Sequence, residues 1–354
     1  MDYIPIFRFG TVEARLLQRD LGNLKIIPLL EITNKSVMQN LCGKIAREFT
    51  GEYFVELPLY LMGNRTTKHM QGLMDILKSL TPPTQNTPPL SHQANFYIQN
   101  KKWIKIPVAS SGDIHSYSDM QATYNAIKPH FDKVAIRILI DEIQLSSQRQ
   151  AILKLLFSQL RETDVVLIDI LRFDSVEQPV LSNLRTVLTM IPPQNKRYIL
   201  NAFDIHDNRS EVHNYGPLIS KHFGMHGFGD FATIIRYEPP GGSPGQRIVR
   251  YYIAQNQHKL LHYARNCFAD AFADIKQSPH WNNSQSFGHL SYCKGCKYAV
   301  TNANEGQTFW KEFRILHYIF SIVNDTLPLS TATKNVQDLD PDGFDNLFKK
   351  VNGI

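Results

Sequence analysis

Residues 133–173 read KVAIRILIDEIQLSSQRQAILKLLFSQLRETDVVLIDILRF and contain the pattern that decides the fold. The two ends, KVAIRILI and DVVLIDILRF, are short apolar runs of the length of a β-strand, and residues 144–162 between them have helical periodicity. Because apolar side chains occupy both faces of each run, the pattern predicts strands that are buried on both sides. A strand, a helix and a second strand form a right-handed βαβ unit, which makes the two strands parallel.

The same unit repeats along the chain. Strands are predicted at residues 3–9, 25–32, 53–61, 103–110, 133–140, 164–173, 197–205 and 232–237, and a further run follows at 248–254. Helices are predicted at residues 11–19, 35–49, 66–80, 117–129, 144–162, 175–190 and 211–222. This alternation predicts an α/β fold, a closed (β/α)8 barrel of the TIM type. The alternative is an open, doubly wound parallel sheet, but no glycine-rich phosphate fingerprint follows the first strand.

The domain prediction places the barrel in residues 1–254. Residues 255–354 are expected to form a C-terminal helical and irregular extension that packs on the barrel. Within this extension, a helix is predicted at 257–275 and another at 306–319.

Composition narrows the class of protein. The 354 residues include 43% hydrophobic and 20% charged residues, as expected for a chain with a core, and the formal net charge is +6. This mild basic excess is compatible with nucleic acid or phosphate esters as ligands. The first residues lack the apolar segment of a signal peptide, and no stretch approaches the ~20 apolar residues of a membrane helix. We therefore expect a cytoplasmic protein that does not enter a membrane.

Polar side chains collect where the predicted strands end. They include Arg8, Glu31, Glu56, Asp169 and Asp204. Chemistry in this fold class is found at the carboxyl ends of the strands, and acids mixed with arginines suit a phosphate ester. The alternative is a set of structural ion pairs, for example between Arg8 and Glu31 on adjacent strands.

Cys293 and Cys296 form a CxxC motif. Zinc would need two further ligands, which His289, His280 or His262 could supply, although their spacing matches no standard pair. A redox pair and two incidental thiols are the other interpretations, and we favour incidental thiols, with no metal site.

The predicted helix at 306–319, GQTFWKEFRILHYI, carries Trp310, Arg314 and His317 on one face. An indole, a guanidinium and an imidazole can together stack on a base and bind an anion. The same three side chains can also form a buried interface, so both interpretations stay open.

Three segments resemble, in order, the C-terminal signature of the Beta protein family. They are FGDFATIIRY (228–237), RYYIA (250–254) and the 306–319 segment, and the N-terminal YIPIFRFGTVEARLL and IIPLLEI resemble the opening of the family. By position the resemblance covers Gly229, Asp230, Arg250, Tyr251, Gly306, Trp310, His317 and Tyr318. This sequence departs from the family pattern in having Lys311 after the tryptophan and Tyr318 after the histidine.

The resemblance implies a context more than a reaction. Members of the family occur in phage satellites, prophages and genomic islands, in modules similar to phage-exclusion or toxin–antidote cassettes. The expectation that follows is a component of an anti-phage defence module, with other proteins of the module as partners.

Three functional hypotheses follow from these residues. The first is recognition of a phosphate-bearing ligand, nucleic acid or a nucleotide, at a barrel mouth overhung by the 306–319 helix. Its predicted ligand contacts are Arg8, Asp230, Arg236, Arg250, Trp310 and Arg314, and its predicted catalytic residues are His317, Glu31 and Asp204. The second is a metal-dependent phosphodiesterase or nuclease that uses Glu31, Glu56, Asp169 and Asp204 as ligands. The third is a non-catalytic scaffold or antidote that binds a partner protein. The sequence identifies no cofactor.

Overall fold

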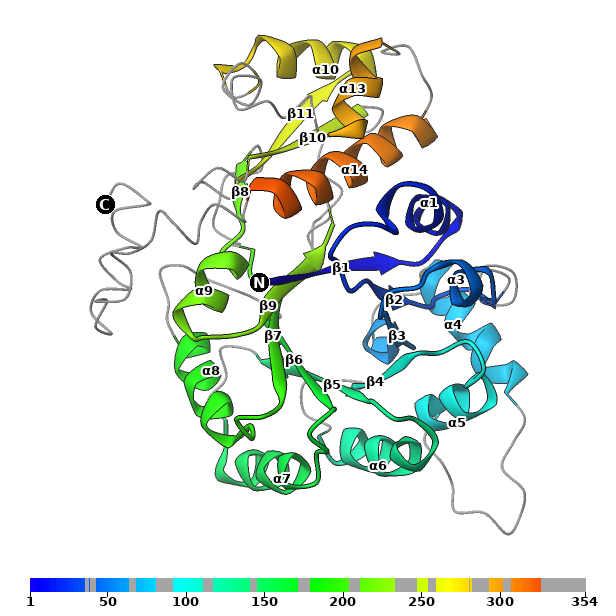
Figure 1. The fold of residues 1–354 in the computed structure, drawn as a ribbon, viewed down its shortest axis with the longest axis vertical. Helices are drawn as coiled ribbons and strands as arrows, with labels where there is room; N and C mark the ends of the chain where they lie inside the picture. Colours follow the sequence, from blue (N-terminus) through cyan, green and yellow to red (C-terminus); the bar gives the residue numbers. More distant parts are fainter. Residues whose placement is uncertain are drawn as a thin grey trace.

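Eight parallel strands close into a barrel in the computed structural model (Figure 1). In order around the barrel they are β1 (Asp2–Arg8), β2 (Leu29–Glu31), β3 (Phe54–Glu56), β4 (Ile106–Ser110), β5 (Ala135–Ile140), β6 (Val165–Ile170), β7 (Lys196–Leu200) and β9 (Gly227–Phe231). Pairing of β9 with β1, which sets Gly229 opposite Ile4, closes the ring. The predicted (β/α)8 barrel is therefore confirmed, and the open-sheet alternative is wrong.

The structure describes a defined part of the chain. The described residues are 1–35, 38, 43–63, 68–80, 92–110, 117–140, 145–170, 179–203, 211–232, 247–253, 259–279, 281, 293–301 and 307–325.

Helices lie between the strands and surround the barrel (Figure 1). They are α1 (Thr11–Leu16) with the π-helical turn η1 (Leu17–Leu21), α3 (Gly43–Glu48), η3 (Leu59–Gly63), α4 (Lys68–Ser79), α5 (His92–Gln99), α6 (Tyr117–Ile127) with η4 (Lys128–His130), α7 (Ser147–Ser158), α8 (Pro179–Met190) and α9 (Gly216–His222). The α5 helix was not predicted. Within α7 the sequence supplies its own start signal, because the Ser146 hydroxyl accepts a bond from the backbone N–H of Arg149 at 3.3 Å.

Alternation along the strands separates two apolar layers. One layer fills the barrel interior and contains Ile4, Ile6, Leu167, Leu200 and Phe231, among others. The second layer, far larger, lies between the strands and the surrounding helices. Successive strand residues point to opposite faces, so the last inward position of each strand lies at the carboxyl end of the barrel. This end is hereafter called the barrel mouth.

The eighth barrel strand lies five residues earlier than predicted. The structure places it at Gly227–Phe231, whereas the sequence analysis chose the short apolar run at residues 232–237. The glycines that make this strand hard to recognise are required by packing. A Cβ at Gly227 would lie 2.0 Å from the Asp2 carbonyl oxygen, and one at Gly229 would lie 2.5 Å from that of Ile4.

A second, smaller sheet lies beside the barrel. It consists of β8 (Glu211–His213), β10 (Arg247–Ile253) and β11 (Lys259–Arg265), in the order β10-β11-β8 with antiparallel pairing. Two predicted helices are therefore partly wrong, because 211–222 begins with β8 and 257–275 begins with β11. The β10 strand, which the sequence analysis included in the 1–254 barrel domain, pairs outside the barrel.

In the described part of the chain, three helices follow the small sheet: α10 (Phe268–Gln277), α13 (Lys294–Thr301) and α14 (Gln307–Asp325). The α14 helix contains most of the predicted 306–319 segment and contacts α1, β1, β10 and α13 (Figure 1). The helices that the structure describes include none with the length and apolar character of a membrane span.

Candidate functional site

Trp310 of α14 is fully buried in a cluster of aromatic rings. Its indole stacks on Phe268 at 5.8 Å between ring centroids, and Phe272 and Phe313 approach it at 5.3 and 5.5 Å. Both Phe268 and Phe272 belong to α10. This packing is at odds with the predicted ligand-stacking role, because the indole has no solvent-facing surface, and it matches the buried-interface interpretation.

Two residues of α14 form ion pairs with the first helix and its extension. Lys311 pairs with Glu13 at 2.6 Å, and Glu312 pairs with Arg15 and, at 3.5 Å, with Arg19. These contacts fix α14 on the outside of the barrel beside α1. The prediction that this helix overhangs the barrel mouth is therefore wrong, and Arg314, half-buried on the same helix, is also placed outside the barrel.

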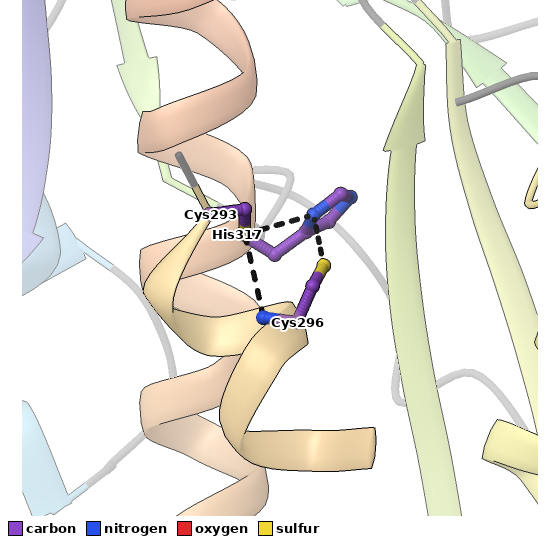
Figure 2. A group of neighbouring side chains, drawn as sticks. All are labelled: Cys293, Cys296 and His317. Carbon is purple, nitrogen blue, oxygen red and sulfur yellow. Dashed lines mark hydrogen bonds between the residues drawn. The ribbon is translucent and has the colours of Figure 1, made fainter. Parts of the chain in front are cut away.

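His317 of α14 is buried and faces two thiols (Figure 2). Its Nδ1 atom lies 3.6 Å from Cys293 Sγ and 3.1 Å from Cys296 Sγ. Burial by itself raises the pKa of the Cys293 thiol, but the contacts with Cys296 and His317 lower that pKa well below its usual range. The sequence analysis treated His317 as a catalytic group and the two thiols as incidental, whereas the structure brings all three together.

Other predicted zinc ligands lie outside the part of the chain that the structure describes. They are His280 and His289, and the side chain of His262 is likewise undescribed.

Asp230 is fully buried and lies on the outer face of β9, opposite in direction to the inward Phe231. It accepts hydrogen bonds from Tyr3 Oη at 2.9 Å and from Asn214 Nδ2 at 2.8 Å, and Asn214 also donates to Tyr318 of α14 at 3.1 Å. Burial outweighs these donors and raises the pKa of Asp230 to about 6. Asp230 thus connects β1, β9 and α14 and does not line the mouth, contrary to the ligand-contact prediction.

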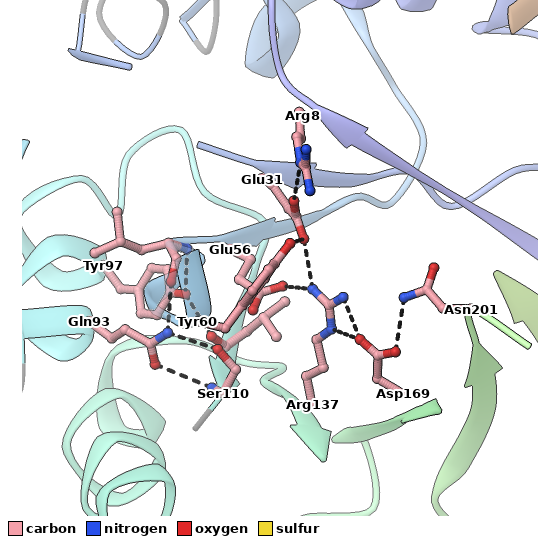
Figure 3. Close-up of polar contacts among 12 residues, drawn as sticks. Arg8, Glu31, Glu56, Tyr60, Gln93, Tyr97, Ser110, Arg137, Asp169 and Asn201 are labelled. Atoms are coloured by element: carbon pink, nitrogen blue, oxygen red, sulfur yellow. Dashed lines mark hydrogen bonds and ion pairs between the residues drawn. The ribbon is translucent and has the colours of Figure 1, made fainter. Parts of the chain in front are cut away.

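At the barrel mouth, the fully buried Arg137 of β5 is surrounded by three carboxylates (Figure 3). Its Nε and Nη2 donate to Asp169 Oδ2 at 2.9 and 2.6 Å, and its Nη1 donates to Glu31 Oε1 at 3.0 Å and to Glu56. All three acids end their strands or lie one residue from the end, and all are fully buried. The barrel closure therefore converts separate strand ends into one ionic cluster.

Neighbouring side chains hold this cluster in place. Tyr60 donates to Glu31 Oε1 at 2.7 Å, and its ring lies 5.5 Å from the Arg137 guanidinium. Asn201, directly after β7, donates to Asp169 Oδ1 at 2.9 Å. Asn201 has φ +59°, the only positive φ of a non-glycine residue in the described part of the chain. Backbone strain of this kind is concentrated at functional sites, because the surrounding structure must maintain it.

Burial and the neighbouring charges shift the pKa values of Glu56 and Arg137. Burial is the main reason that the pKa of Glu56 is raised, with a contribution from Glu31, while Arg137 acts in the opposite direction. Burial lowers the pKa of Arg137, but the three surrounding acids raise it well above its usual range, so the guanidinium stays charged.

Arg8 and Glu31 retain unused hydrogen-bonding capacity. Arg8 Nε and Glu31 Oε2 lie 3.8 Å apart as an ion pair, and each lacks a hydrogen-bond partner among the described residues. The Arg8 side chain is 28% exposed, and its guanidinium lies 5.2 Å from the centre of the Phe231 ring. Arg8 is therefore the member of this pair that reaches solvent, whereas the Glu31 side chain is fully buried.

Several predicted site residues cannot be placed. Asp204 and Arg236 lie outside the described residues, and of Arg250 only the backbone position in β10 is described. The structure therefore unites Arg8 and Glu31 at the mouth and separates them from His317, Trp310 and Asp230.

Sequence reasoning missed Arg137 and Tyr60. The signal for Arg137 was present, because it is the only charged residue within the apolar run AIRILI. A charge at such a position is costly unless partners surround it, which would have directed attention to the acids at the neighbouring strand ends. Tyr60 gave no comparable signal, whereas Asn201 belongs to the polar residues that follow the predicted strands.

A scan against protein-family models found no match, and a search of curated proteins found no similar chain. The resemblance to the Beta protein family stays a prediction.

Proposed function

We propose that the barrel mouth is an active site that acts on a phosphate-bearing ligand, a nucleotide or a nucleic acid. Arg8 contacts the phosphate, and Glu31 serves as general base. The single observation that carries this proposal is the buried Arg137 cluster, in which Glu31 Oε2 and Arg8 Nε remain without hydrogen-bond partners among the described residues.

The proposed chemistry assigns different roles to the two oxygens of Glu31 and to Arg8. Arg137 and Tyr60 both donate to Glu31 Oε1, which fixes the carboxylate and leaves Oε2 directed toward Arg8. A guanidinium suits a phosphate because its planar N–H groups match two phosphate oxygens. A fixed carboxylate next to the bound group can accept a proton from water or a hydroxyl, which contributes roughly 10²–10⁴ to a rate.

Metal-dependent catalysis by Glu31, Glu56 and Asp169 fits the cluster less well. Arg137 lies among these three carboxylates and donates to each of them, so a divalent cation would have to displace or repel a guanidinium. A scaffold or antidote role has no observation of its own in its favour. Asp204 remains a candidate catalytic residue beside Glu31, because it follows β7 in the sequence.

The biological setting in the proposal is a cytoplasmic, anti-phage defence module. It is supported by the resemblance to the Beta protein family. The free thiols of Cys267, Cys293 and Cys296 are typical of a reducing compartment. Other proteins of the module are the proposed protein partners.

A binding experiment tests the role of Arg8. The purified full chain is titrated calorimetrically with nucleoside mono- and triphosphates and a short single-stranded oligonucleotide. Arg8→Gln should weaken the best ligand by roughly 1.5–3 kcal/mol, about 10- to 100-fold in Kd. The matched control is Arg265→Gln, which removes an exposed arginine paired with Asp274 far from the mouth. Equal affinity in the native chain and Arg8→Gln would refute the assigned contact.

A turnover experiment tests the role of Glu31. Hydrolysis of the ligands that bind is followed by ³¹P NMR, and Glu31→Gln keeps the size of the side chain while removing its basicity. We expect turnover to fall by about 10²–10⁴ with binding retained. Loss of phage protection in cells that carry Glu31→Gln, but not Arg265→Gln, would connect the site to defence.

A further inference from the structure

We propose that Cys293, Cys296 and His317 form a zinc-binding site that joins α13 to α14. Among the described residues, these three make the only group of histidine, cysteine or acidic side chains close enough together to hold a metal ion. Their ligand atoms all lie within 4.8 Å of one another. Thiolate and imidazole ligands in a buried, compact group favour zinc over magnesium or calcium.

The distances fit a tetrahedral zinc centre. With Zn–S of about 2.3 Å and Zn–N of about 2.0 Å, tetrahedral angles put a sulfur and a nitrogen ligand about 3.5 Å apart. The observed separations from His317 Nδ1 are 3.6 Å to Cys293 Sγ and 3.1 Å to Cys296 Sγ. The same geometry puts two sulfur ligands about 3.8 Å apart. Since all three ligand atoms lie within 4.8 Å of one another, small side-chain shifts would let a metal ion fit between them.

Local structure presents each ligand. Cys293 directly precedes α13, and the backbone N–H of Cys296 donates to Cys293 Sγ at 3.4 Å, a bond that stabilises a thiolate. The His317 ring stacks on Phe313 with 5.7 Å between ring centroids and an interplanar angle of 6°, which fixes its orientation. The Ser321 hydroxyl lies 3.5 Å from His317 Nδ1.

The three side chains supply three of the four positions of a tetrahedral site, and their burial favours a metal that holds the fold together. All three ligands are almost completely buried, and α13 and α14 lie side by side with the ligand atoms between them. A metal held by the CxxC motif and His317 would fix α13 against α14. His317 is adjacent to Tyr318, which contacts Asn214 and through it Asp230 of the barrel. The zinc site would therefore connect the C-terminal elements to the barrel wall.

Metal analysis of the full chain provides the first test. Protein purified without chelator is analysed by mass spectrometry of dissolved metals and should contain about one zinc per chain. Cys296→Ser and His317→Ala should lose most of it. The matched control is Cys267→Ser, because Cys267 is an exposed thiol outside the group. Zinc content that is the same in all variants, or absent from the native chain after growth in zinc, would overturn the proposal.

Cobalt substitution provides a second test, and its first measurement needs only the native chain. The native chain, stripped of metal under reducing conditions, is titrated with Co²⁺. We expect the ligand-field bands of a tetrahedral site together with thiolate-to-cobalt charge-transfer absorption. His317→Cys should retain these bands, since three thiolates also form zinc sites, whereas His317→Ala should not. Octahedral cobalt spectra alone, or isolation of a Cys293–Cys296 disulfide that excludes the metal, would overturn the proposal.

Discussion

Asp230 makes the stability of the fold depend on pH in a way that can be calculated. The side chain is fully buried between β9 and α14, and burial raises its pKa from 3.8 to about 6. A shift of about two units corresponds to about 3 kcal/mol, at about 1.4 kcal/mol per unit. Because the folded state holds this proton more tightly than the unfolded state, the stabilisation is fully present below about pH 4 and is lost as pH rises through about 6.

The variant Asp230→Asn isolates this contribution. Asparagine cannot ionise, so the difference in unfolding free energy between the native chain and the variant should fall by roughly 2.5 kcal/mol from pH 4 to pH 7. Any hydrogen bond that asparagine fails to make to Tyr3 or Asn214 adds a constant and leaves this slope unchanged. Urea unfolding, followed by tryptophan fluorescence at four pH values, measures the difference.

The control for this experiment is Asp274→Asn, which removes a half-buried carboxylate paired with the exposed Arg265. Its difference from the native chain should vary with pH by less than about 1 kcal/mol, as expected for a surface ion pair. A difference between the native chain and Asp230→Asn that stays constant from pH 4 to pH 7 would show that Asp230 is not a buried, ionising group.

Three further predictions follow from the same structure. Arg137→Met leaves three buried carboxylates without their cation and should cost about 3–5 kcal/mol in urea unfolding at pH 7, with partial recovery at pH 5; a loss below about 1 kcal/mol would contradict the cluster. Gly229→Ala brings a Cβ to 2.5 Å from the carbonyl oxygen of Ile4 and should lower stability by about 1–3 kcal/mol in thermal unfolding, whereas an unchanged Tm would contradict the close approach of β1 and β9. Tyr318→Phe removes the hydroxyl that accepts a hydrogen bond from Asn214, and it should lower the free energy of unfolding by about 1 kcal/mol and raise the pH at which Asp230 titrates. An unchanged titration of Asp230 would show that Tyr318 of α14 does not belong to this network.

The barrel was predictable from the sequence because its strands are buried on both faces. Runs such as AIRILI and VVLIDI are apolar at nearly every position, which distinguishes them from the helices between them. The eighth strand was misplaced because GFGDF contains two glycines where β9 approaches β1, and local propensity cannot report contact with a strand more than two hundred residues away.

The candidate site was predicted only in part. Glu31 and Arg8 were found because they end apolar strands, a local feature. Arg137 was missed, since its meaning depends on acids from three other strands that only barrel closure brings together. The surroundings of His317 could not be predicted either, since they too depend on packing. A helix face of Trp310, Arg314 and His317 is compatible with a ligand-binding site, a buried core or a metal site.

We expect the ligand to bind, and its reaction to occur, between Arg8 and Glu31. A crystal structure with the tightest-binding nucleotide tests this expectation most directly. The prediction is a phosphate within hydrogen-bond distance of the Arg8 guanidinium, with the scissile bond next to Glu31 Oε2. A nucleotide bound away from the barrel mouth, with Arg8 and Glu31 unchanged from their 3.8 Å pairing, would contradict the proposed site.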